Sequence, residues 1–186
     1  FNIQKEWLDD LRLKGSYGEQ GNMLDNQTPE LIIKKGNMNS FYDEFTSTAA
    51  YFANPDLKWE KTHSFNVGLE SSFFSNRLQF EVEYYYKKTT DAFMNKTIAD
   101  VNGYTSYVVN SGNIINKGFN FTLTATPVKV KDFYWIFSGN LSKAYNRVET
   151  APGAETYTLN DFLTGNAVVK GQPVGTFYSY RFLGLR

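Results

Sequence analysis

Two glutamates stand two positions apart in the segment Arg77–Lys88, whose sequence is RLQFEVEYYYKK. In an extended chain, Glu81 and Glu83 would point to the same side with their Cα atoms about 6.6 Å apart. That spacing overlaps the separation of the two carboxylates in inverting glycosidases. Two neighbours on one strand point the same way, however, and cannot flank a sugar ring from opposite sides. The pair is therefore interpreted as part of a polar face, and we expect no enzyme activity from it.

Other catalytic arrangements find no support. The chain lacks cysteine and has one histidine, His63, which excludes thiolate chemistry and a metal site built from several histidines. The sequence has no glycine-elbow motif that would supply a nucleophile for His63. The segment GNAVVKG (165–171) lacks the spacing of a phosphate-binding loop. The 19 basic residues balance the 19 acidic ones, so no charge pattern indicates nucleic acid. We expect no catalytic residue, no metal site and no cofactor.

Strands dominate the sequence pattern. Apolar and polar residues alternate in the segments 11–18, 64–73, 77–88, 119–126 and 133–142, and more weakly in 176–183. Aromatic residues make up 17% of the chain, which suits a pleated sheet better than helices. No apolar run approaches the roughly 18 residues that a transmembrane helix needs. The sequence predicts an all-β, antiparallel fold.

The connections between these strands are of two kinds. Ser75-Asn76 and 127–131 are tight turns, whereas 19–62, 90–116 and 148–174 are long and polar. Alternation alone fits both a soluble sheet and a membrane sheet. Long structureless loops are uncommon in compact domains, but an outer-membrane barrel has short periplasmic turns and long outer loops. The long strands and the aromatic residues at their ends also favour a transmembrane β-barrel.

Specific motifs then resemble one family, the SusC/RagA-type TonB-linked outer-membrane transporters. They occur in this order: LRLKGSYGEQGN (11–22), NPDLKWEKTHSFNVGLESSFFSNRLQFEVEYYYKKTTD (54–91), NSGNIINKGFNFTLT (110–124), DFYWIFSGNLSKAYNRVE (132–149) and GQPVGTFYSYRFLGL (171–185). The resemblance spans most of the chain and breaks in the long loops.

The resemblance implies a TonB-dependent transporter with a barrel of about 22 strands closed by a plug. Residues 1–186 would be a fragment of the β-barrel domain, without the plug domain or the terminal strand. Such proteins import oligosaccharides or peptides with a SusD-like surface lipoprotein as a lid, powered by TonB through a segment outside this chain. The expected location is the outer membrane of a Gram-negative bacterium of the Bacteroidetes type.

This interpretation assigns the two faces of the strands to different surroundings. The residues expected to face lipid are Leu78, Phe80, Val82, Phe119, Phe121, Leu123, Trp135 and Phe137. The residues expected to face the lumen are Glu81, Glu83, Asn120, Thr122, Thr124, Ser138 and Asn140. Aromatic side chains in the outer loops are candidates for substrate contact, namely Phe41, Tyr42, Tyr104 and Tyr107. The same rings could instead pack the loops against each other or against the lid.

Two alternatives remain at the level of the sequence. One is a secreted or surface β-sandwich that binds glycans, in which the apolar faces would meet each other. The other is a glycoside hydrolase segment built on Glu81 and Glu83. Because an open strip of barrel has two unpaired edges, we also expect residues 1–186 alone to be unstable as a soluble monomer.

Overall fold

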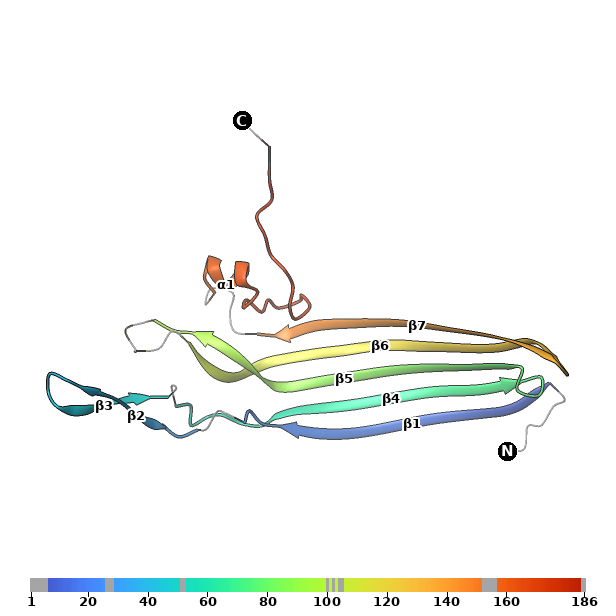
Figure 1. Ribbon diagram of the computed structural model, residues 1–186, viewed down its shortest axis with the longest axis horizontal. Coiled ribbons are helices and arrows are strands. Elements are labelled where there is room, and N and C mark those ends of the chain that lie inside the picture. Colours follow the sequence, from blue (N-terminus) through green and yellow to red (C-terminus); the bar gives the residue numbers. More distant parts are fainter. Residues whose placement is uncertain are drawn as a thin grey trace. The chain divides into compact units, whose positions relative to one another are not determined.

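A computed structural model describes residues 7–25, 29–50, 53–99, 101, 103, 106–151 and 157–184. Five long strands form one sheet in the order β1-β4-β5-β6-β7 (Figure 1). They are β1 (Leu8–Asn22), β4 (Glu60–Phe73), β5 (Leu78–Thr97), β6 (Ser106–Val130) and β7 (Phe133–Thr150). Their lengths reach 20 and 25 residues in β5 and β6, against about five or six in globular proteins. The predicted all-β fold is confirmed.

Two smaller elements complete the described structure. A separate hairpin pairs β2 (Ile33–Asn39) with β3 (Glu44–Ala49), and α1 (Leu159–Thr164) is a helix of six residues. None of the helices in the described ranges is long and apolar enough to cross a bilayer. Contacts divide the chain into two compact units. The first contains Thr62–Lys88 and Ile115–Arg147 with most of β1, and the second contains the hairpin, α1 and the remaining ends of the long strands.

The two short turns lie where the sequence predicts them, with one adjustment. Phe74, Ser75 and Asn76 all have positive φ between 55° and 61°, and they reverse the chain between β4 and β5. Asn76 N–H is held by the Asp9 carboxylate at 2.8 Å. The second turn is shorter than expected, because β6 continues through Pro127 to Val130 and β7 begins at Phe133.

The prediction of three long structureless connections was wrong in part. The hairpin β2–β3 occupies much of 19–62, and β5 and β6 extend to Thr97 and from Ser106, which leaves only a short connection between them. These strand ends mix polar and apolar residues without a clear period of two: Ala92 and Met94 near the end of β5 are buried, and Phe93 stands between them. Asp91, with φ of 55°, also interrupts the alternation within β5.

The weak strand expected at 176–183 does not form. Among the described residues that follow β7, backbone pairing with that strand involves Val148 alone, whose N–H donates to the Gln172 carbonyl at 2.9 Å and whose carbonyl accepts from Gly171 N–H at 2.8 Å. Gly175 then has φ of 77°, which turns the chain out of an extended conformation. A strand requires a neighbour for its backbone groups, and the described chain offers none to this segment.

The sheet has almost no apolar core. Among the described residues, the buried hydrophobic side chains are Leu8, Ala92, Met94, Val148 and Ala167. Large apolar residues of the long strands are instead exposed, including Leu13 at 79%, Phe137 at 51% and Leu141 at 61%. A sandwich would bury such side chains between two sheets. The apolar surface is therefore suited to contact a medium other than water.

Candidate functional site

The polar side chains of three adjacent strands meet in one depression on the first unit. Its lining consists of Glu81, Glu83, Asn120, Thr122, Asn140 and Ser142. Asn120 Nδ2 donates to Glu83 Oε2 at 3.3 Å, which links β5 to β6. Thr124 Oγ1 lies 3.3 Å from Ser138 Oγ, which links β6 to β7. Alternation thus brings five of the seven residues expected to face the lumen into one depression, namely Glu81, Glu83, Asn120, Thr122 and Asn140.

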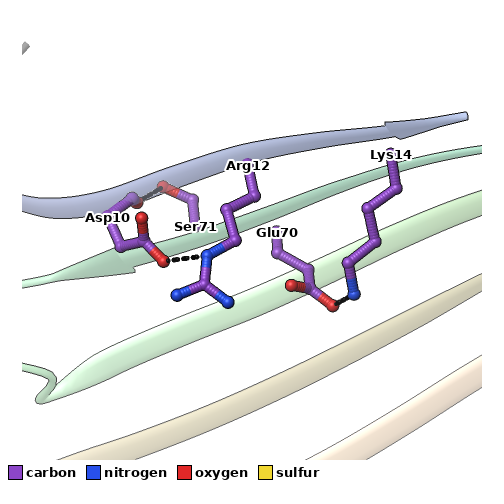
Figure 2. A network of polar contacts seen from close by, with 5 residues as sticks. All are labelled: Asp10, Arg12, Lys14, Glu70 and Ser71. Carbon is purple, nitrogen blue, oxygen red and sulfur yellow. Dashed lines mark hydrogen bonds and ion pairs between the residues drawn. The ribbon is translucent and has the colours of Figure 1, made fainter. Parts of the chain in front are cut away.

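Charged residues continue this polar face onto β1 and β4. Figure 2 shows Arg12 Nε paired with Asp10 Oδ2, at 2.7 Å, and Lys14 paired with Glu70 across the two strands. Asn66 Nδ2 donates to Ser16 Oγ at 3.1 Å on the same pair of strands. None of these charged residues was among the predicted site residues. The signal was present, because Arg12, Lys14 and Ser16 alternate with Leu11 and Leu13.

Glu81 and Glu83 lie side by side along one strand and line an open polar surface. Each also borders further polar groups, Gln79 and Thr124 near Glu81 and Asn66 and Asn116 near Glu83. The geometry places the two carboxylates in a continuous polar wall. It does not place them on opposite sides of a cleft.

The opposite face is apolar and has aromatic rings at the short-turn end. Trp7 and Phe73 stack with centroids 5.7 Å apart, and Phe73 stacks on Phe80 at the same distance. The three rings form a row beside the 74–77 turn, with Trp7 directly before β1, Phe73 at the end of β4 and Phe80 near the start of β5. Among the residues expected to face lipid, Val82, Phe119, Trp135 and Phe137 are exposed, and Leu78, Phe80, Phe121 and Leu123 are half-buried.

The outer-loop candidates are not brought to one place. Tyr107 lines a polar depression of the second unit with Asn54, Asp56, Lys58, Asp91, Val109 and Asn110. Phe41 and Tyr42 lie at the tip of the β2–β3 hairpin, 84% and 70% exposed, with their rings in edge contact at 4.9 Å. Neither ring lines the depression that holds Tyr107. Tyr104 lies outside the described residues.

A single antiparallel sheet of long strands, polar on one face and exposed and apolar on the other, is the wall of a transmembrane β-barrel. The particular family follows from comparison with known proteins. Residues 5–184 match the family described as TonB dependent receptor-like, beta-barrel. The chain belongs to this family of TonB-dependent receptors, which are outer-membrane proteins. The β-sandwich alternative is therefore wrong.

Individual relatives agree with this assignment. TonB-dependent receptor P26 of Formosa agariphila is 32% identical over 190 residues, which cover 99% of this chain and 19% of that protein. TonB-dependent receptor SusC of Bacteroides thetaiotaomicron is 30% identical over 155 residues, which cover 80% of this chain and 16% of SusC. The chain thus spans less than a fifth of the length of these relatives.

A solved structure gives the same result in three dimensions. The structure of the RagAB peptide transporter superposes with a TM-score of 0.69 at 34% identity, over 81% of this chain and 16% of that chain. The described sheet therefore has the fold of one part of a TonB-dependent barrel.

Proposed function

We propose that this chain forms part of the wall of an outer-membrane, TonB-dependent importer of peptides or oligosaccharides. The observation that carries the proposal is the division of one sheet into two faces. The residues Glu81, Glu83, Asn120, Thr122 and Asn140 would face the plug or water, and the apolar residues of the same strands would face lipid. Transport needs binding and gating, so none of these side chains has to take part in covalent chemistry.

The length of the strands supports a membrane-spanning position. Trp7, directly before β1, and Tyr17, within it, are ten positions apart. A rise of about 3.3 Å per residue and a tilt of about 40° give roughly 25 Å along the membrane normal. This matches the height of about 25 Å that the apolar band of an outer-membrane barrel has between its aromatic girdles. The short turns would then lie at the periplasmic side.

Two features favour peptides as the first substrate class to test. The wall carries both signs of charge, with Arg12 and Lys14 beside Glu70, Glu81 and Glu83. A peptide presents both a charged amino end and a charged carboxyl end to such a surface. The superposed RagAB structure is described as a peptide transporter. An oligosaccharide remains the second substrate class.

The proposal includes partners outside this chain. A SusD-like surface lipoprotein would close the outer side, and TonB would act through a segment outside residues 1–186. The exposed tip residues Phe41 and Tyr42, together with Tyr107, would contact the substrate or the lid. The host would be a Gram-negative bacterium of the Bacteroidetes type, because Formosa and Bacteroides supply the similar receptors.

Uptake by cells that carry the full-length protein tests the proposal. Labelled peptide mixtures and labelled oligosaccharide mixtures are offered to the wild type, to a strain without this protein and to a strain without TonB. We expect accumulation of one substrate class that requires both the protein and TonB. Equal accumulation in all three strains would refute an importer. Turnover of glycan by the purified protein that is lost in Glu81→Gln or Glu83→Gln would instead support the hydrolase.

A further inference from the structure

Lysine and arginine gather on the apolar face of β5, β6 and β7, at the end away from the short turns. This basic patch consists of Lys88, Lys117, Lys143 and Arg147, with Tyr84, Tyr86 and Tyr145 between them. All of these residues belong to the first compact unit. We propose that the patch binds the phosphate groups of phosphorylated lipids in the outer leaflet. The proposal rests on the membrane orientation given above.

The register of β6 against β7 follows from contacts on the polar face. Thr124 meets Ser138, and Asn146 Nδ2 donates to Asn116 Oδ1 at 2.5 Å. The two contacts are eight positions apart on each strand, so the pairing does not slip between them. Residues at the positions between them then alternate to the other face. This places Lys117 opposite Tyr145 on the apolar face, and Phe119 opposite Lys143.

The register of β5 against β6 follows in the same way. Glu83 accepts from Asn120, and the Tyr85 hydroxyl lies close beside Gly118. These contacts advance by two positions on one strand and fall back by two on the other, as antiparallel pairing requires. On the apolar face, Tyr86 therefore stands opposite Lys117, and Lys88 stands opposite Ile115.

The patch thus consists of three rows that cross the strands. They are Tyr84–Phe119–Lys143, Tyr86–Lys117–Tyr145 and Lys88–Ile115–Arg147. Side chains directly opposite each other have Cβ atoms about 5 Å apart, and successive rows are about 7 Å apart. The cations therefore lie within reach of one phosphorylated headgroup. Lys143 Nζ lies 5.6 Å from the centre of the Tyr145 ring, which confirms that residues 143 and 145 share a face.

Charge and exposure identify the partner. No acidic residue occupies a position in these rows. Within the described ranges, no residue forms an ion pair with Lys117, Lys143 or Arg147, and all three are exposed. Neighbouring barrel strands pair through the backbone at a sheet edge, so they leave this face uncovered. Each Lys or Arg near an anionic membrane surface contributes about 1 kcal/mol of attraction.

The position along the strand separates a lipid from a soluble anion. Tyrosine rings favour the boundary between hydrocarbon and headgroups, and lysine and arginine extend from that level toward the phosphates. The basic patch interleaves these two residue types over three rows of one face. A free anion would need no apolar surface next to its cations, whereas a lipid contacts the apolar strand with its chains and the patch with its headgroup.

Lipid retention by the purified full-length protein tests the proposal. Wild type and the triple variant Lys117→Gln, Lys143→Gln, Arg147→Gln are compared in non-ionic detergent. The control replaces the same number of cations near the short turns, as Arg77→Gln, Lys129→Gln, Lys131→Gln. The probes are lipid A, the same lipid after removal of its phosphates, and inorganic phosphate alone. Bound lipid is counted by native mass spectrometry, and folding of each variant is checked by heat-modifiable gel mobility.

We expect the triple variant to bind lipid A at least tenfold more weakly than wild type and the control variant. Equal binding by all three proteins would overturn the proposal, as would equal binding of the lipid without phosphate. Displacement of lipid A by millimolar inorganic phosphate would assign the patch to a soluble anion. Loss of a co-purifying protein from the triple variant, with unchanged lipid binding, would assign it to a protein partner. The measurement involves neither TonB nor uptake, so failure of import leaves its result unaffected.

Discussion

The side chain of Asn110 pairs with the backbone of Lys58 as a neighbouring strand would. Asn110 Oδ1 accepts from Lys58 N–H at 2.7 Å, and Asn110 Nδ2 donates to the Lys58 carbonyl at 2.8 Å. The same amide group donates to the Asp91 carbonyl at 2.7 Å. Nearby, Asn54 Nδ2 donates to the Val108 carbonyl at 2.8 Å. One side chain on β6 therefore fixes both the Asn54–Lys58 turn and the interruption of β5 at Asp91.

Replacement of this amide should loosen the turn. In Asn110→Leu, Lys58 N–H and two carbonyls lose their partner, and each lost bond costs about 1 kcal/mol. We expect local stability of residues 53–61 to fall by roughly 2–3 kcal/mol, measured as faster amide hydrogen exchange in the full-length protein. The control is Asn95→Leu, at an exposed asparagine of β5. Unchanged exchange in Asn110→Leu would show that the turn is held by other contacts.

A side chain at position 118 is expected to clash with its neighbours in the barrel wall. A Cβ atom built at this position would lie 2.3 Å from the Lys143 carbonyl oxygen and 2.7 Å from the Tyr85 hydroxyl. Gly118→Ala should therefore force β6 and β7 apart locally and destabilise the barrel by about 1–3 kcal/mol. Gly15→Ala is the matched control, because a Cβ at Gly15 meets nothing within 4 Å. The check is the temperature at which each folded barrel loses its altered gel mobility, and equal temperatures would contradict the steric argument.

Local alternation explains how much of this structure could be predicted from sequence. Residues two apart on a strand share a face wherever the chain is extended, so Glu81, Glu83 and Thr122 could be assigned to one face without knowing their neighbours. The same rule assigns Val82 and Phe119 to the apolar face, and both side chains are exposed. The turn at Ser75-Asn76 was predictable because asparagine tolerates positive φ.

The remainder depends on contacts between distant segments. Lys14 and Glu70 are paired across strands that are separated by 56 positions. Asn110 on β6 joins Lys58 in the turn before β4 to Asp91 on β5. No apolar pattern in the sequence marks these contacts. Strand ends such as Ser106–Asn110 carry apolar residues on both faces, with Tyr107 and Val109 on one and Val108 on the other, so the period-2 signal vanishes where hydrogen bonding continues. The sequence therefore predicts the face on which a strand residue lies better than it predicts where the strand ends.

Adjacent substitutions on β6 test the two faces directly. Phe121 points to the apolar face and Thr122 lines the polar depression. An arginine on the lipid face costs about 2–4 kcal/mol near the bilayer midplane. Phe121→Arg should destabilise the barrel by this amount in lipid vesicles, whereas Thr122→Arg should cost less than about 1 kcal/mol. Denaturant unfolding from vesicles measures both, and an equal or reversed cost would mean that the faces are assigned incorrectly.

Residues 1–186 produced alone should require detergent. The edge strands β1 and β7 have no further partner in the described sheet, and the apolar face is open to solvent. Exposed edges and a contiguous apolar surface both promote aggregation in water. We expect aggregates by light scattering without detergent and a β-rich circular dichroism spectrum in micelles. A monodisperse monomer that unfolds cooperatively in buffer would contradict this expectation.

The stability of helix α1 should depend on pH through the carboxylate of Asp161. Its carboxylate accepts from the backbone N–H of Thr158 at 2.7 Å and from the Thr158 hydroxyl at 2.8 Å. These hydrogen bonds, the backbone one first, hold the pKa of Asp161 below its usual value. A carboxylate with a lowered pKa in the folded state stabilises that state above its unfolded pKa of about 4, and the contribution is lost as the pH falls through the lower folded pKa.

We therefore expect α1 to be protected at neutral pH and to open progressively below about pH 4. The Phe162 ring, which contacts Tyr157 and Tyr178, should become more mobile at the same time. Hydrogen exchange of residues 157–165, corrected for the intrinsic pH dependence of exchange, measures the opening in the full-length protein. Asp161→Asn keeps the shape of the cap but cannot titrate, so its protection should be lower at neutral pH and should not change in this window. The same pH dependence in the variant would show that another group controls the helix.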